Sequence, residues 1–294
     1  MNTKAPSIKH QASSRIRDIG KLQGPFLVFG GVYSNLQALV ALTNEAEALG
    51  IPPENIVCTG DVVAYCAQAA ACVDLIRSWG VHTICGNVEL NLLDQADDCG
   101  CNFDEGSRCD LFSRQWYPYA QSQMTKEHLA FLETIPHHLR FEYNGKKVVV
   151  VHGTFDNVSG YVFKSTDWAE KAAVLNQVDA DVVLAGHCGL PFIDKHEEQY
   201  WINAGVIGMP ANDGQSSTWY CLINEAKDGL QVAFKTLVYD YKKTADLMLE
   251  NGLPKAYAET LKTGVWDNCE ILPTYETQQQ GKKLIFEERM LVLL

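Results

Sequence analysis

The chain has 294 residues, is 47% hydrophobic and carries a formal net charge of −12. That length and apolar content suffice for a sizeable core, which excludes wholesale disorder and favours one large α/β domain or two small ones. The acidic balance argues against sequence-independent nucleic-acid binding, which needs a basic face. No apolar run approaches the roughly 20 residues of a membrane-spanning helix, so we expect no membrane association through such a helix.

The first 24 residues are polar and contain no apolar stretch typical of a secretory signal, so we expect an N-terminal arm over residues 1–24. The chain has ten cysteines, a density well below that of a disulfide scaffold. Without an export signal, reduced thiols in the cytoplasm are the expectation.

Apolar, β-branched runs recur along the first two thirds of the chain, and each ends at small or polar residues. They occupy residues 25–31, 55–61, 81–87, 147–153 and 181–187. Continuous apolar runs of this length are typical of strands buried on both faces. Helical patterns separate them, over residues 35–49, 66–79, 125–134 and 167–177. This alternation predicts a parallel-rich sheet with helices on its faces.

The pattern changes after residue 195. Three strand-like segments follow one another with short turns, at residues 198–205, 216–224 and 229–241. They predict an antiparallel meander that forms a second sheet. Residues 243–264 return to a helical pattern, and we expect residues 265–294 to be a C-terminal tail. The acidic, cysteine-bearing and aromatic segment 94–123 is too long for a plain loop, and we expect it to form a cap or lid.

Four residues suited to metal binding lie at the ends of the strand runs: Asp61, Asn87, His152 and His187. Each is next to a glycine, which lets the backbone turn sharply. Because the carboxyl ends of parallel strands meet at one edge of a sheet, we expect these side chains to form one metal shell. Taken singly, each has an ordinary alternative as a helix cap, a turn residue or a structural histidine.

The motifs GD (60–61), GN (86–87), HG (152–153) and GH (186–187), in this order, resemble those of the calcineurin-like metallophosphoesterases. Longer stretches, such as WINAGVIGMP, resemble the bacterial predicted-phosphodiesterase branch of that family. The resemblance covers about residues 25–264. It implies an α/β fold, a four-layer α-β-β-α sandwich of mixed sheets, with the metal site at the carboxyl ends of the strands.

The departures from the family pattern fall on one side of the site. Gly31 and Tyr33 stand where the family has an aspartate and a histidine, and Gly189 replaces a second histidine. The resemblance therefore implies that the ligands exclusive to one metal are lost. The shell of the other metal is complete in Asp61, Asn87, His152 and His187, so we expect one divalent ion, Zn, Fe or Mn.

Tyr33 has two interpretations: it fills the space of the missing metal, or it takes a tentative catalytic role as a hydrogen-bond donor. Four further residues are expected to support the site or line its substrate loop: Asn35, Glu89, Cys188 and Asn203. Cys99, Cys101 and Cys109 are spaced C-x-C-x₇-C and are candidates for a second metal or thiol cluster. Free thiols or one disulfide are the alternatives.

We expect a divergent metal-dependent phosphoesterase that acts on a phosphorylated small molecule or a phosphodiester. Val88 stands where the family has its catalytic histidine, and general acid help is typically worth about 10²–10⁴-fold, so hydrolysis is expected to be slow or unusual. A non-catalytic binding or regulatory module is the alternative. Redox chemistry at a single iron is a third hypothesis, because two histidines and a carboxylate resemble a facial triad.

Overall fold

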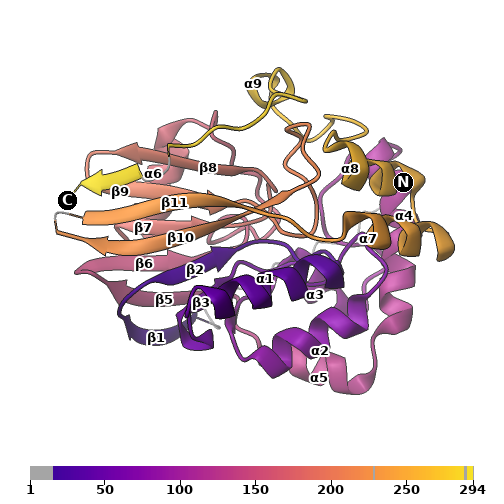
Figure 1. Ribbon diagram of the computed structural model, residues 1–294, viewed down its shortest axis with the longest axis horizontal. Helices are drawn as coiled ribbons and strands as arrows, with labels where there is room; N and C mark the ends of the chain where they lie inside the picture. Colours follow the sequence, from indigo (N-terminus) through magenta and orange to yellow (C-terminus); the bar gives the residue numbers. More distant parts are fainter. Residues whose placement is uncertain (1–15, 228, 288–289, 294) are drawn as a thin grey trace, which may run out of the picture.

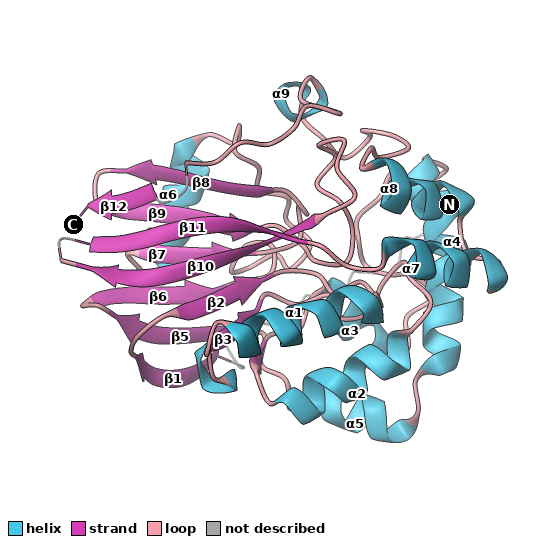
Figure 2. Ribbon diagram, in the orientation of Figure 1, coloured by secondary structure: helices cyan, strands magenta, loops and turns pink. Residues whose placement is uncertain are grey.

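The computed structural model describes residues 16–227, 229–287 and 290–293 of the chain. Two mixed sheets of six strands each pack face to face, and helices cover their outer faces (Figures 1 and 2). The expected α/β sandwich of two mixed sheets with flanking helices is therefore confirmed. Within the described ranges, no helix is long and apolar enough to cross a membrane.

The first sheet has six strands, in the order β1 (Ile16–Leu22), β5 (His138–Tyr143), β6 (Lys146–Val150), β7 (Val182–Ala185), β9 (Gln199–Ala204) and β8 (Pro191–His196). The second has the order β12 (Met290–Leu293), β11 (Gly229–Leu237), β10 (Thr218–Ala226), β2 (Phe26–Phe29), β3 (Ile56–Cys58) and β4 (His82–Thr83). In the second sheet β2, β3 and β4 run parallel, and in the first β6, β7 and β9 do. Both parallel sets end at the same side of the molecule (Figure 1).

Most helices lie beyond the second sheet and around the carboxyl ends of its strands (Figure 2). They are α1 (Leu36–Ala48), α2 (Ala69–Trp79), α3 (Asn87–Leu93), α4 (Arg108–Gln123), α5 (Lys126–Thr134), α7 (Tyr241–Glu250) and α8 (Lys255–Thr263). The first sheet is covered by α6 (Trp168–Gln177), which contacts β9. Two short elements complete the described chain, the 3-10 helix η2 (Pro53–Asn55) and α9 (Thr274–Thr277).

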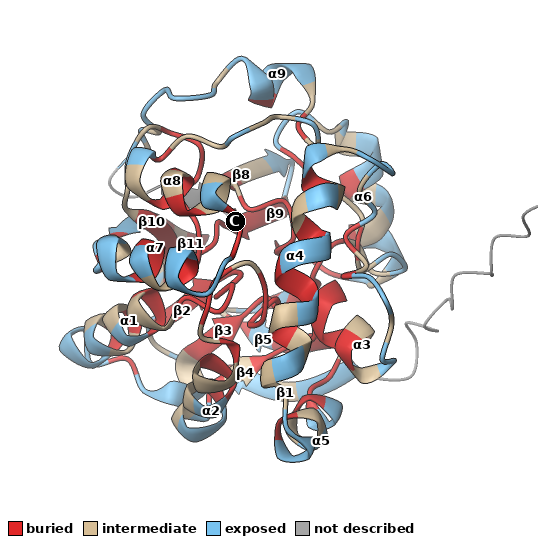
Figure 3. Cartoon of the chain, turned by 90° about the vertical axis from the view of Figure 1, so that its right-hand side faces the viewer, coloured by how far each residue is buried: buried red, intermediate tan, exposed pale blue. Residues whose placement is uncertain are grey.

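The strand β2 shows how the layers are held together. Phe26 and Val28 point into the core between the two sheets, whereas Leu27 and Phe29 point into the core beneath the helices. Figure 3 shows buried segments inside the molecule and exposed residues on the outer helices. Since period-2 alternation sends successive side chains to opposite faces, a strand between two cores must be apolar throughout.

The predicted grouping of strands was wrong in two respects. The five early runs do not form one sheet, because β2, β3 and β4 belong to the second sheet, and β6 and β7 to the first. The three later segments do not form one meander either: β9 belongs to the first sheet, whereas β10 and β11 pair antiparallel in the second. The hydrophobic pattern indicates that a strand is buried on both faces, but it does not indicate which strands are its neighbours in the sheet.

The helical predictions are confirmed to within a few residues for α1, α2, α5 and α6. The helical region after residue 240 is split into α7 and α8, as the intervening Asn-Gly-Leu-Pro suggests. The expected cap segment 94–123 contains α4, and the expected tail contains α9 and β12. Part of the expected N-terminal arm forms β1, and residues 1–15 lie outside the described residues.

Candidate metal centre

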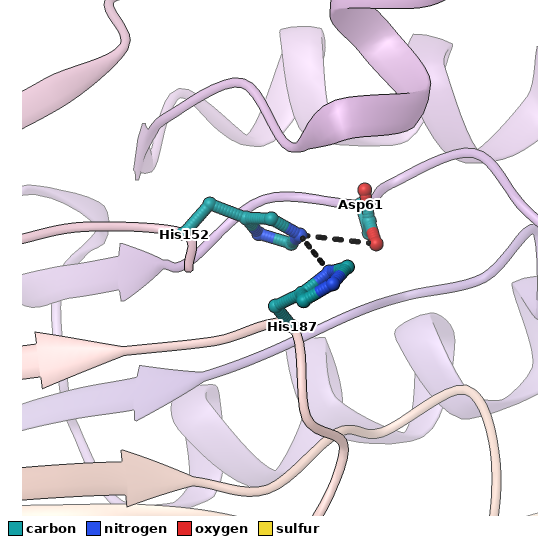
Figure 4. Close-up of side chains that lie close together, drawn as sticks. All are labelled: Asp61, His152 and His187. Carbon is teal, nitrogen blue, oxygen red and sulfur yellow. Dashed lines mark hydrogen bonds and ion pairs between the residues drawn. The ribbon is translucent and has the colours of Figure 1, made fainter. Parts of the chain in front are cut away.

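Asp61, His152 and His187 come together at the carboxyl ends of the parallel strands. Each offers one possible ligand atom, and these atoms all lie within 4.8 Å of one another. Figure 4 shows the His152 ring joined by dashed lines to both Asp61 and His187. Asp61 follows β3 of the second sheet, while His152 and His187 follow β6 and β7 of the first. The centre is therefore assembled between the two sheets, not at the edge of one.

Nε2 of His152 lies close to a donor atom of each of the other three residues. It lies 3.2 Å from Asp61 Oδ2, 3.2 Å from His187 Nδ1 and 3.2 Å from Asn87 Oδ1. Atoms that share a metal ion at about 2.0–2.1 Å are about 2.8–3.0 Å from one another at adjacent octahedral positions and about 3.3–3.4 Å from one another in tetrahedral geometry. The spacing of these donor atoms therefore fits a common divalent ion.

The hydrogen bonds around His152 indicate that Nε2 carries no hydrogen in the neutral ring. Nδ1 lies 2.7 Å from the carbonyl oxygen of Thr59, which can only accept, so Nδ1 carries the hydrogen in the neutral ring. The Nε2 lone pair then faces two oxygen acceptors, from Asp61 and Asn87. Electron-rich atoms that converge in this way favour a cation between them, and a backbone carbonyl is a usual partner of the other ring nitrogen of a metal-bound histidine.

The two histidines titrate differently. Burial, and then the neighbouring His152, lowers the pKa of His187 to about 3, so this imidazole stays neutral. Its Nε2 is buried and has no hydrogen-bond partner among the described residues. For His152, burial lowers the pKa, but the charge of Asp61 and the hydrogen bonds to Asp61 and Thr59 outweigh it, so the pKa is raised. Without a metal ion, a proton on His152 is the competing cation.

Glu89 holds the loop that carries Asp61. Its carboxylate accepts hydrogen bonds from the backbone N–H groups of Asp61 at 2.9 Å, Val63 at 2.9 Å and Gly86 at 2.8 Å. Asp61 has a φ of +53°, a left-handed conformation that costs energy for a residue with a side chain. Burial, and then the charge of Asp61, raises the pKa of Glu89 to about 7. Glu89 thus has a positioning role and does not itself reach the cluster of ligand atoms.

Asn87 is oriented by the cysteine-bearing segment. Its Nδ2 donates to the carbonyl oxygen of Cys99 at 2.9 Å and to the Cys101 sulfur at 3.3 Å, which turns Oδ1 toward His152. The thiols of Cys99 and Cys101 lie 2.6 Å apart, whereas the Cys109 thiol contacts Asn268 Oδ1 at 3.5 Å. Among the described residues, Asp61, His152 and His187 are the only metal-capable trio found, and the thiol cluster stays a prediction.

The remaining expected site residues support the surrounding loops. Asn203 Nδ2 donates to the carbonyl oxygen of Gly186 at 2.6 Å and to the Cys188 sulfur at 3.2 Å, so it holds the turn around His187. Asn35 caps α1 by accepting from the Ala38 N–H at 3.1 Å, and it also accepts from the Thr244 hydroxyl at 2.9 Å. Its role is therefore to join α1 to α7.

The ring of Tyr33 lies where a side chain at residue 31 would have to be. A Cβ atom built on Gly31 would collide with this ring, and one built on Gly189 would lie 3.9 Å from the Tyr33 hydroxyl. Burial, and then the charge of Asp61, raises the pKa of Tyr33 well above its usual value, so it is a neutral phenol. Tyr33 therefore occupies the space next to both glycines and can act only as a hydrogen-bond donor or a weak acceptor.

A pocket opens beside the cluster, and Tyr33, Asp61 and His187 line its floor. Much of its wall comes from aromatic residues that sequence reasoning did not assign to the site, among them Tyr65, Tyr161, Tyr257 and Trp266. Aromatic residues in α/β chains are usually core residues, so no sequence signal distinguished these. The support of His152 by the Thr59 carbonyl was also missed, because any residue can supply a backbone carbonyl.

A fold of two mixed sheets with an Asp–Asn–His–His cluster between them defines a metallophosphoesterase-like protein. The sequence profile of the "Calcineurin-like phosphoesterase superfamily domain" matches residues 30–228, and the chain belongs to this superfamily. The match covers strands of both sheets, from β3 to β10, and all four residues of the cluster.

The similar proteins add support for the fold. An uncharacterized protein from Methanocaldococcus jannaschii is 27% identical over 252 residues, which are 81% of this chain and 97% of the relative. A metallophosphoesterase from Sphaerobacter thermophilus has a TM-score of 0.65 at 23% identity, covering 83% of this chain and 100% of that one. A hypothetical protein from Pyrococcus horikoshii has a TM-score of 0.69 at 18% identity, covering 82% and 99%.

Proposed function

We propose that this protein is a metal-dependent phosphoesterase that holds one divalent ion, Zn, Fe or Mn, where most of its family holds two. The observation that carries the proposal is the equal spacing of Asp61, Asn87 and His187 around His152 Nε2, at 3.2 Å each. Two imidazoles, a carboxylate and an amide oxygen suit these borderline ions.

The restriction to one ion is supported by Tyr33. Its ring excludes a side chain at residue 31, and its hydroxyl lies beside Gly189, so the place that the family resemblance assigns to a second ion is filled by a phenol. Gly31 and Gly189 bring no ligand atoms of their own. This arrangement favours the interpretation of Tyr33 as a space-filling residue, and its buried hydroxyl faces the pocket beside Asp61.

A bound ion would supply Lewis-acid stabilisation and a water molecule of lowered pKa. The chain's own residues set the limits of the reaction. Asp61, Asn87, His152 and His187 orient the donor atoms, and Glu89 and Asn203 fix the loops that carry them. The Tyr33 hydroxyl is the donor placed to contact a substrate oxygen. Val88 is buried in the core and carries no proton, so the leaving group receives no acid assistance from residue 88.

A non-catalytic binding protein is the second candidate, and Val88 is the observation that favours it. A superfamily member that kept its metal but lost its acid can serve as a ligand-binding or regulatory module. For either function we propose the cytoplasm as the compartment, a reducing environment in which free thiols persist.

Element analysis of the full chain, purified without added metal, tests the metal site. We expect about one equivalent of Zn, Fe or Mn per chain in the wild type, and less than about a tenth of that in Asp61→Ala and His187→Gln. His196→Gln is the matched control, because His196 is exposed and remote from the cluster. Two equivalents in the wild type, or unchanged metal content in both variants, would contradict the one-ion proposal.

Turnover separates the enzyme from the binding module. Phosphomonoesters, phosphodiesters and nucleotides are assayed with the metal-loaded wild type and with His152→Gln. Activity that falls by at least about 10²-fold in His152→Gln identifies a hydrolase. Metal-loaded protein without turnover of any of these esters favours the binding module.

A further inference from the structure

The pocket beside the metal cluster has an aromatic wall built from distant parts of the chain. Half-buried aromatic side chains line it, namely Tyr65, Phe103, Tyr161, Tyr257 and Trp266. They come from the loop before α2, the segment before α4, the loop after β6, α8 and the segment after α8. Half-burial leaves part of each ring free to contact a ligand, whereas a core aromatic would have no free face.

Trp266 is held in place at the mouth of this pocket. Its indole Nε1 donates to the carbonyl oxygen of Pro210 at 2.7 Å, and its backbone N–H donates to Asn212 Oδ1 at 2.8 Å. A Cβ atom on Gly189 would lie 3.6 Å from the indole ring, so the ring lies directly over the backbone that follows His187. A rigid ring so close to the metal cluster is a preorganised stacking surface.

Tyr257 and Tyr65 form another part of the wall. Their ring centroids lie 5.0 Å apart with an edge-on angle of 68°, and Tyr65 also meets Tyr33 edge-on at 4.7 Å. The aromatic wall is thus continuous with the residue that lies beside Asp61. One molecule can therefore contact the aromatic wall and the candidate metal ligands at the same time.

The charge of the pocket favours a substrate with little negative charge. The residues that line it include the carboxylates of Asp61 and Asp267, and no lysine or arginine is among those that the structure describes there. The nearby Arg108 is already engaged, since its Nη2 lies 2.7 Å from Asp267 Oδ1 and its guanidinium lies 5.2 Å from the centre of the Phe112 ring. A phosphomonoester dianion would find no cation here apart from the metal ion, whereas a phosphodiester carries a single charge.

We propose that this aromatic pocket is a subsite for a flat aromatic arm of a phosphodiester whose phosphate lies at the metal cluster. The inference rests on the proposed function, and it goes further by naming the substrate class. The flat arm can be an aryl group or a nucleobase, because both present a π-face to Trp266 and the tyrosines. Stacking of this kind is expected to strengthen binding about ten-fold or more.

Calorimetric titration of the metal-loaded full chain tests the subsite without requiring turnover. Diphenyl phosphate, diethyl phosphate and phenyl phosphate are compared at pH 8, so that charge and aromatic character vary separately. We expect diphenyl phosphate to bind about ten-fold or more tightly than diethyl phosphate, and more tightly than phenyl phosphate. Equal affinity for the two diesters, or tighter binding of phenyl phosphate, would overturn the proposal. Thymidylyl-thymidine is titrated as a fourth ligand. Its affinity relative to diphenyl phosphate shows whether the flat arm is a nucleobase or a simple aryl group, and either result supports a flat arm.

Substitutions at Trp266 connect the preference to the pocket. Trp266→Ala should remove most of the difference between the two diesters, and Trp266→Phe should retain part of it. Trp168→Ala, which removes an indole that stacks on His196 away from the pocket, is the matched control and should leave the difference unchanged. A Trp266→Ala variant that weakens both diesters equally would contradict the subsite.

The outcomes for the subsite and for the proposed function are separable. Selective binding of diphenyl phosphate without turnover would refute the phosphoesterase and support the subsite. Turnover of phosphodiesters with no preference for an aromatic arm would refute the subsite alone.

Discussion

Tyr33 occupies space beside the candidate metal centre because of its backbone conformation. Its backbone lies in the left-handed region, with φ of +53°, and its N–H donates to the carbonyl oxygen of Asp61 at 3.1 Å. This strained turn directs the ring into the space that Gly31 leaves free. The two residues are therefore coupled: the ring fits only because residue 31 has no side chain.

This coupling predicts a steric effect at residue 31. Gly31→Ala should destabilise the wild type by about 1–3 kcal/mol, because the new methyl group overlaps the Tyr33 ring. In a Tyr33→Ala background the same substitution should cost much less, since the ring is gone. Urea unfolding of the four proteins of this double-mutant cycle measures the coupling. An equal loss in both backgrounds would show that the ring does not occupy this space.

His138 predicts a pH dependence of stability that is independent of the metal cluster. It is buried and stacks on Phe155, with ring centroids 4.6 Å apart. Burial, and then the neighbouring His137, lowers the pKa of His138 from 6.5 to about 4. His138 binds a proton more tightly in the unfolded chain than in the folded one. Its contribution to the free energy of unfolding is therefore complete above pH 6.5 and is lost as the pH falls from 6.5 to 4.

The wild type should lose free energy of unfolding between pH 7 and pH 4, and we expect His138→Phe to lose about 1–3 kcal/mol less over the same range. Chemical denaturation at the two pH values, with exposed His196→Gln as the control, measures the effect. The prediction fails if both variants keep the pH dependence of the wild type.

At the scale of elements, the segment after α8 is more than a tail. It carries Trp266 into the pocket wall and β12 onto the edge of β11. Glu276 of α9 is buried and accepts hydrogen bonds from the Ser165 N–H at 3.0 Å and the Ser165 hydroxyl at 2.6 Å. This pair ties the C-terminal segment to the loop before α6. The sequence pattern did not reveal the tie, because a polar segment with short apolar runs resembles a solvated tail.

Glu276→Ala should therefore lower the free energy of unfolding by about 1–3 kcal/mol, because it removes a buried carboxylate and the two hydrogen bonds that it accepts from Ser165. Glu287→Ala is the control, since Glu287 is exposed, and it should change stability by less than about 0.5 kcal/mol. Urea unfolding of both variants makes the comparison. Similar stabilities would indicate that water replaces Glu276 without loss.

At the scale of the whole molecule, the two sheets meet at the metal cluster. Asp61 and Asn87 follow strands of the second sheet, whereas His152 and His187 follow strands of the first. A bound ion would therefore link the two halves of the sandwich, and it would stabilise the folded chain as any ligand of the native state does.

Chelation should consequently lower the melting temperature of the wild type. A free metal concentration of about 100 times Kd stabilises a protein by about 2.7 kcal/mol, which corresponds to several degrees for a chain of this size. The effect should weaken as pH falls, because a proton on His152, whose pKa is raised, competes with the ion. Asp61→Ala should melt at the same temperature with and without chelator. A chelator effect that persists in this variant would place the stabilising ion elsewhere.

The four candidate ligands could be picked out from the sequence, because strand ends in an α/β chain carry recognisable glycine-flanked polar residues. The burial of each strand was also readable, because apolar runs report burial directly. The sharing of strands between two sheets was not, since neighbours in a sheet are set by long-range packing and not by local pattern. The aromatic wall around Trp266 and the support of the Asp61 loop by Glu89 arise only when distant segments meet, and the position of the Tyr33 ring against Gly31 depends on a left-handed turn that the residue types did not reveal. Tertiary structure therefore decided which strands lie side by side and which side chains line the pocket, whereas local sequence established the fold class and the candidate ligand residues.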